Sequence, residues 1–133
     1  LLYAYSEASV PKLTVTLRKS YGGSSIAMGN KDLGCDFMLA WPQAEIAVMG
    51  AEGAANIVFR KDIDDSPDPT AMRTQKIEEY RTAFANPYVA AERGFVDRVI
   101  LPEDTRKEIA AALALTHGKS VRRPKRKHGV MPH

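Results

Sequence analysis

The stretch KSYGGSSIAM, residues 19–28, decides how the rest of the chain is interpreted. An apolar, alternating run with β-branched residues, Leu13 to Leu17, precedes it and predicts a strand. The two glycines then predict a tight turn, and the residues after them predict the first turn of a helix that stops near Gly29. The first amides of a helix have no acceptor inside it, and its dipole favours negative charge there. The stretch therefore suits an oxyanion bound by main-chain donors, and the same pattern is also that of an ordinary turn.

This stretch departs from the familiar phosphate-binding and nucleophile motifs. It lacks the Gly-Lys-Ser/Thr ending of a P-loop and the third glycine of a dinucleotide fingerprint. Ser24 and Ser25 lie outside a Gly-x-Ser-x-Gly pattern, and no His stands nearby to act as a base. Any chemistry at this turn is therefore expected to use the backbone.

Composition predicts one packed domain, or part of one. Hydrophobic residues make up 44% of the 133 residues, and the longest uncharged runs are too short and too interrupted for a membrane span. The single cysteine, Cys35, excludes an internal disulfide and a Cys-based zinc site, and it suits a reducing compartment. Its apolar neighbours predict a buried, inert thiol, and we expect no metal site in the chain.

The net charge of +3 is concentrated at one end. Residues 119–133 hold six Lys and Arg and no acid, which leaves 13 basic and 16 acidic residues in 1–118. We expect a folded, mildly acidic part over 1–118 and a basic, extended tail over 119–133. No aromatic residue interrupts the basic run, which disfavours nucleic-acid binding and leaves a solvated tail or one that docks on an acidic surface.

Short strands alternating with helices predict an α/β fold. No convincing internal sequence repeat is visible. The expected strands are 13–17, 37–41, 45–49 and 96–101, with 37–41 buried on both faces. The expected helices are 1–9, 23–29, 52–61, 69–85, 88–93 and 103–117. Asp68 is expected to cap the helix over 69–85, and Gly94 to end the one over 88–93. The expected apolar faces are Ala54, Ile57 and Val58 in 52–61, and Ile109, Leu113 and Thr116 in 103–117.

Five motifs stand out along the chain: YGG at 21–23, WP at 41–42, EIAVMG at 45–50, ANPYVAA at 85–91 and KHG at 127–129. Together they resemble the carboxyltransferase β-subunit of biotin-dependent acyl-CoA carboxylases, of the propionyl-CoA and acetyl-CoA carboxylase type. The resemblance covers essentially the whole chain and matches the carboxyl-terminal part of such a subunit, so the chain looks like a fragment. It implies a crotonase-like fold of repeated β-β-α units wound into a superhelix.

The resemblance implies a function for the glycine turn. It places the oxyanion hole for biotin at the backbone of Gly23 and Ser24, and we expect a side chain at Gly23 to clash with the turn. The family usually shows Ala and Tyr after the two glycines, and a backbone donor survives the change to Ser24 and Ser25. The remaining substrate-binding candidates are Gly22, Ser25, Ile26 and Gly50, with Ile26 either shaping the acyl pocket or lying in the core.

The implied reaction is carboxyl transfer from carboxybiotin, carried on a separate domain, to the α carbon of a short-chain acyl-CoA such as propionyl-CoA or acetyl-CoA. The implied partners are a biotin carboxylase or biotin carrier subunit and further copies of the chain in a hexamer, without nucleic acid or membrane. The implied location is the cytoplasm, or the mitochondrial matrix in a eukaryote. Two alternatives remain open: the carboxyltransferase subunit of a sodium-pumping acyl-CoA decarboxylase, and a non-catalytic assembly fragment.

Overall fold

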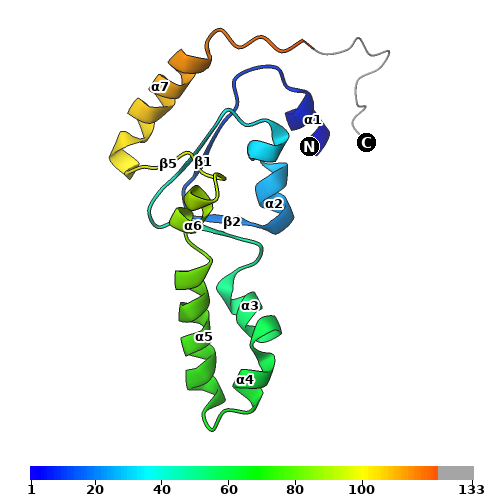
Figure 1. Cartoon of the computed structure of the whole chain (residues 1–133), viewed down its shortest axis with the longest axis vertical. Helices are drawn as coiled ribbons and strands as arrows, with labels where there is room; N and C mark the ends of the chain where they lie inside the picture. The colour runs from blue at the N-terminus through cyan, green and yellow to red at the C-terminus, as the bar shows by residue number, and fades with distance from the viewer. Residues whose placement is uncertain (123–133) are drawn as a thin grey trace.

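The computed structural model describes residues 1–122 and contains two small parallel sheets (Figure 1). The first sheet has the order β1 (Leu13–Thr16), β3 (Phe37–Ala40), β5 (Arg98–Val99). The second pairs β2 (Lys19–Tyr21) with β4 (Glu45–Ala47). The α-helices are α1 (Leu2–Glu7), α2 (Gly22–Ala27), α3 (Ala51–Val58), α4 (Arg60–Asp64), α5 (Pro69–Ala83), α6 (Pro87–Glu92) and α7 (Thr105–Thr116), with 3₁₀ turns at Lys31–Leu33 and Pro102–Asp104.

The backbone repeats a β-β-α unit. One unit runs β1-β2-α2, the next runs β3-β4-α3, and the strands of the two units pair in parallel, with Leu13 opposite Phe37 and Lys19 opposite Glu45. The expected α/β class is confirmed. The repeat is not detectable in the sequence, because the two units share the same backbone path but not the same pattern of residues.

β3 lies at the centre of the first sheet and of the core. Met38, Leu39 and Ala40 are buried, so the prediction of a strand covered on both faces is confirmed. Ala40 and Ala44 pack against α6 and the segment after it, and their cluster partners are Ala90 and Val96. Trp41, which follows β3 directly, donates a hydrogen bond from Nε1 to Thr105 Oγ1 (2.9 Å), at the start of α7.

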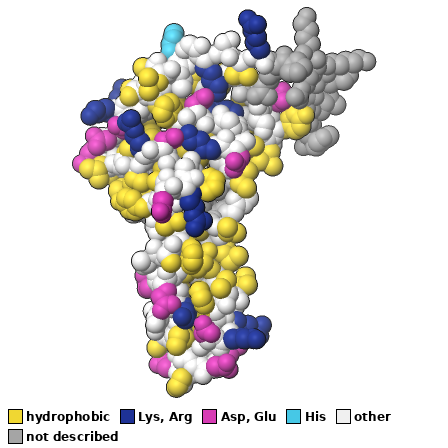
Figure 2. Space-filling model, in the orientation of Figure 1, with side chains coloured by type: hydrophobic (Ala, Val, Ile, Leu, Met, Phe, Trp, Pro, Cys, Tyr) yellow, Lys and Arg dark blue, Asp and Glu magenta, His cyan; other side chains and the backbone are white. Residues whose placement is uncertain are grey.

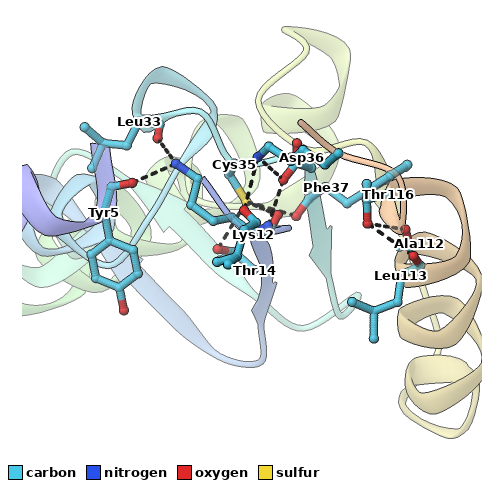
Figure 3. A network of polar contacts seen from close by, with 12 residues as sticks. Tyr5, Lys12, Thr14, Leu33, Cys35, Asp36, Phe37, Ala112, Leu113 and Thr116 are labelled. Atoms are coloured by element: carbon cyan, nitrogen blue, oxygen red, sulfur yellow. Dashed lines mark hydrogen bonds and ion pairs between the residues drawn. The ribbon is translucent and has the colours of Figure 1, made fainter. Parts of the chain in front are cut away.

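A polar network surrounds the entry to β1 (Figure 3). The Lys12 ammonium donates to the carbonyl oxygens of Tyr5 (2.7 Å) and Leu33 (2.6 Å), and the Lys12 amide donates to the Asp36 carboxylate (2.7 Å). The Cys35 thiol is buried and donates to backbone oxygens, including that of Phe37 (3.1 Å). The prediction of a buried cysteine is confirmed.

Helices α3, α4 and α5 form an arm that extends away from the sheets (Figure 1). Its interior joins Ala51 and Ala55 of α3 to Ile77 of α5. The predicted start of α5 is confirmed, since the Asp68 side chain accepts the Ala71 amide (3.0 Å) and Pro69 follows it. The short helix α6 and its ending at Gly94, with φ 78°, are also as predicted.

The structure corrects several boundaries. The helix expected over 52–61 is two helices, which meet at Phe59 with φ −108°. Its expected stripe is right at Ala54, which is buried together with Ala51 and Ala55, and wrong at Ile57 and Val58, which are 69% and 62% exposed. The alanine side of α3 packs against α5, because small side chains allow the two helices to approach closely. The strand expected over 96–101 is reduced to Arg98–Val99, and strand β2 was not expected at all.

In the last helix, too, an alanine is buried while a larger apolar residue of the expected face is exposed. α7 begins at Thr105 and buries Ala112, whereas Leu113 of the expected apolar face is 44% exposed. Within residues 1–122 no helix is long and apolar enough to cross a membrane. Most of the predicted basic tail, residues 123–133, lies outside the described residues, and so does the KHG motif.

Candidate functional site

Two helices begin at the same edge of the second sheet. β2 ends at Tyr21 and leads directly into α2, while β4 ends at Ala47 and leads through Gly50 into α3. Tyr21 and Ala47 are paired across this parallel ladder, so both strands present their carboxyl ends together. The structure therefore places the Gly22–Gly23 turn and the turn at Gly50 side by side.

The adjacent glycines of the first turn have different surroundings. Gly22 has φ 53°, and a Cβ built on it would lie 3.0 Å from the Val48 carbonyl oxygen. A Cβ built on Gly23 would meet nothing within 4 Å. The expected clash at Gly23 is therefore wrong for this chain: Gly22 is the position where the backbone needs glycine, and Gly23 leaves its backbone accessible.

The hydroxyl groups beside the turn are engaged in local hydrogen bonds. Ser24 Oγ donates to the Tyr21 carbonyl oxygen (2.6 Å), and Ser25 Oγ lies 2.6 Å from Ser20 Oγ. The first turn of α2 contains no acidic residue, and helix geometry gives the Gly23 and Ser24 amides no acceptor inside the helix. These two amides are thus the donors that the turn offers to a ligand.

The start of α3 differs because a carboxylate already lies there. Glu52 accepts a hydrogen bond from its own backbone amide, which with the nearby Arg81 holds its pKa below the ordinary value of 4.5. The Arg81 guanidinium lies 2.6 Å from Glu52 Oε1. Glu52 is thus a first-turn helix charge of α3, and of the two turns the α2 start is the one without a carboxylate of its own.

Tyr21 connects the two turns, and sequence reasoning gave it no role. Its hydroxyl donates to the Glu45 carboxylate, and a Cβ on Gly50 would lie 3.2 Å from its Cε2 atom. Burial, followed by the hydrogen bond to Glu45, raises the pKa of Tyr21 to about 12. Glu45 is thus a hydrogen-bonded residue of β4. The one signal for Tyr21 in the sequence was its place directly before the two glycines, in the YGG motif.

The remaining predicted residues lie around the same turn. Ile26 is on α2 and is 44% exposed, so it does not lie in the core of this chain. Gly50 is the N-cap of α3, against the Tyr21 ring. Among residues 1–122 no group of three or more His, Cys, Asp or Glu side chains is arranged to hold a metal ion.

Parallel β-β-α units with glycine turns at one sheet edge fit the family that the sequence comparison gives: the chain belongs to the carboxyl transferase domain family. The model of the carboxyl transferase domain family matches residues 1–131. The fold is crotonase-like and covers part of such a domain.

Three relatives show which members of the family the chain is similar to. It is 64% identical to the methylmalonyl-CoA carboxyltransferase 12S subunit of Propionibacterium freudenreichii subsp. shermanii, over 132 residues. It is 57% identical to the methylmalonyl-CoA decarboxylase subunit alpha of Propionigenium modestum, and 54% identical to the propionyl-CoA carboxylase carboxyltransferase subunit of Haloferax mediterranei. Each match covers 99% of this chain and 25% or 26% of the relative.

The structural comparison agrees. A crystal structure of transcarboxylase 12S, described as a hexamer assembly with methylmalonyl-coenzyme A and methylmalonic acid bound, superposes with a TM-score of 0.92 at 64% identity. The match covers 99% of this chain and 25% of that one. The chain thus spans about a quarter of the length of its relatives, and its assignment to their carboxyl-terminal half stays a prediction.

Proposed function

We propose that this chain supplies the biotin-side oxyanion hole of a carboxyltransferase that moves a carboxyl group between carboxybiotin and the α carbon of propionyl-CoA or a similar short-chain acyl-CoA. The observation that carries the proposal is the start of α2, where two backbone amides lie beside a glycine whose side-chain position is open. The names of the three relatives support the substrate class, because methylmalonyl-CoA is the α-carboxylated form of propionyl-CoA.

The residues present fit the ureido group of biotin. When bound, carboxybiotin supplies the carboxyl group, and negative charge develops on the ureido oxygen as that group leaves. The Gly23 and Ser24 amides would donate to this oxygen, and preorganised donors of this kind stabilise a developing charge at no cost of reorientation. The absence of an acidic residue from the first turn of α2 favours the same anion.

The neighbouring candidates receive supporting roles. Gly22 sets the turn, Ser25 and Gly50 border it, and Ile26 would contact the acyl chain from α2. We propose that the acyl-CoA is held mainly by parts of the protein other than this chain. Further copies of the subunit, in a hexamer like that described for transcarboxylase 12S, and a biotin carrier or biotin carboxylase subunit would complete the enzyme, in the cytoplasm or a mitochondrial matrix.

Substitutions at Ser24 test this function in the assembled enzyme that contains the chain. Ser24→Pro removes the amide donor, and loss of one oxyanion-hole donor typically lowers the rate by about a hundred- to a thousand-fold. Ser24→Ala keeps the amide and loses only the hydroxyl bond to the Tyr21 carbonyl, so it should retain most activity. Carboxyl transfer from a biotinylated carrier is measured for both variants, and size-exclusion chromatography checks that each still assembles.

The contrast between the two variants decides the matter. If Ser24→Ala abolished transfer in an intact oligomer, the hydroxyl and not the backbone would carry the chemistry. If Ser24→Pro transferred carboxyl groups at the normal rate, the oxyanion hole would lie elsewhere.

A second candidate is the same half-reaction in a decarboxylase. The 57% identity to a methylmalonyl-CoA decarboxylase subunit favours it, because the turn would then stabilise the same oxygen while the carboxyl group moves onto biotin. Purification of the enzyme with its partners separates the two: a biotin carboxylase indicates the carboxylase, and a membrane-embedded decarboxylase subunit indicates the alternative.

A further inference from the structure

Tyr21 joins the two glycine turns through three groups. Its backbone is the N-cap of α2, and its carbonyl oxygen accepts the Ser24 hydroxyl (2.6 Å). Its ring lies against Gly50, and its hydroxyl donates to the carboxylate of Glu45. The Tyr21 side chain therefore contacts both β4 and the Gly50 turn.

The contact between Tyr21 and Glu45 crosses the β2–β4 ladder diagonally. In the β2–β4 ladder Tyr21 is paired with Ala47, while Glu45 is paired with Lys19, two positions earlier. The Tyr21 side chain thus runs diagonally back along the partner strand and fixes the end of β2 both along and across the ladder. The Gly23 and Ser24 amides follow within three residues, so their direction depends on how Tyr21 is held.

We infer that Tyr21 and Glu45 are positioning residues, which hold the end of β2 so that the Gly23 and Ser24 amides point at the developing oxyanion. The inference rests on the proposed function and adds to it a pair of side chains that do not touch the substrate. Gly50 is part of the same arrangement, because a side chain there would displace the Tyr21 ring.

The chemistry of the pair suits this role. A hydrogen bond to a carboxylate is stronger than one between neutral groups, and the phenol stays protonated, hence a donor, far above neutral pH. Oxyanion donors act through preorganisation, so a small loss of order at the turn reduces the rate without changing substrate contacts made elsewhere.

The test uses the assembled enzyme with a biotinylated carrier and propionyl-CoA. Tyr21→Phe keeps the ring against Gly50 and removes the hydroxyl, while Glu45→Ala removes the acceptor. Each should lower kcat by about ten- to a hundred-fold and leave the KM for propionyl-CoA within about twofold, because misplacement of catalytic groups acts on the transition state. The double variant should be no slower than the slower single variant, since both remove the same bond.

Matched controls come from α6. Tyr88→Phe and Glu92→Ala make the same chemical changes at exposed positions and should leave kcat unchanged. Glu45→Gln keeps an oxygen that accepts the phenol, so it should recover part of the rate lost in Glu45→Ala.

The outcomes separate this inference from the proposed function. Full kcat in Tyr21→Phe, with only a lower melting temperature, would overturn the positioning role even when Ser24→Pro is inactive. Additive losses in the double variant would also overturn it. Unimpaired transfer by Ser24→Pro would instead refute the oxyanion hole itself.

Discussion

At the scale of single residues, Gly22 and Gly23 are neighbours with opposite requirements. Gly22 occupies the left-handed region at φ 53° and faces the Val48 carbonyl oxygen, whereas the side-chain direction of Gly23 is open. Both glycines are conspicuous in the sequence as a turn. The sequence does not distinguish them, because the crowding at Gly22 comes from Val48, which follows β4 and lies 26 residues further along the chain.

Alanine at each glycine should therefore have different effects on stability. Gly22→Ala forces a side chain into the left-handed region and against a backbone oxygen, and should lower the free energy of unfolding by about 1 to 3 kcal/mol. Gly23→Ala meets no neighbouring atom and should change it by less than about 1 kcal/mol, in the stabilising direction. Urea unfolding of the two variants beside the parent measures both values. Equal destabilisation by the two alanines would contradict the difference between these positions.

At the scale of elements, a local signal predicted correctly where a side chain caps its own helix. Asp68 with Pro69 predicted the start of α5. The structure shows a second cap of this kind at α6, where the Asn86 side chain accepts the Tyr88 and Val89 amides. The misses depend on distant partners. β2 is three residues long and exists because β4 pairs with it, and β5 is held to β3 by Asp97, which accepts the Met38 amide (2.7 Å) and pairs with Lys31 (2.6 Å).

Asp36 links elements from both ends of the described chain and gives a pH-dependent prediction. Lys119, after α7, places its ammonium 2.7 Å from the Asp36 carboxylate and also reaches the Val10 carbonyl oxygen (3.2 Å). Partial burial alone would raise the pKa of Asp36, but the hydrogen bonds from Lys119 and the Lys12 amide and the charges of both lysines outweigh it. The pKa is therefore held below its ordinary value of 3.8.

A carboxylate with a depressed folded-state pKa contributes stability above its unfolded pKa and loses it as the pH falls toward the folded one. Asp36→Asn should lower the free energy of unfolding by about 1.5 to 3 kcal/mol at pH 7, the usual value for hydrogen bonds to charged groups. The gap from the parent should narrow below pH 3.8. Asp65→Asn, at an exposed loop position, is the control and should show no such trend in unfolding measured across pH. A gap that is constant with pH would show that the carboxylate charge is not what stabilises the contact.

At the scale of the whole molecule, the glycine turns of the site could be predicted from sequence motifs, but the side chains that connect them could not. The glycine turn at 22–23 and the turn at Gly50 are visible in the sequence, and the structure places them side by side. Their connection by Tyr21 and Glu45 follows from the register of a ladder between segments about 25 residues apart, which no local pattern specifies. The exposed side chains of the arm were not predicted either. Ile57 and Val58 belong to an apolar stripe, which predicts burial, but the side of α3 that packs in the structure is formed by alanines.

That exposed face yields the last prediction. The arm presents Ile57, Val58 and Phe84, each at least half exposed, and hydrophobic side chains are visible along it in Figure 2. Apolar surface of this kind is removed from water by self-association, so residues 1–133 alone should associate as concentration rises. The double variant Ile57→Gln/Val58→Gln should weaken association by about tenfold or more, since burying one such side chain is worth about 1.5 to 3 kcal/mol. Sedimentation velocity over a concentration series measures this, and Leu115→Gln, at a 76% exposed position on α7, is the matched control. If the α7 variant weakened association and the arm variant did not, the contact would lie on α7, and the arm would not be the surface through which copies of the chain meet.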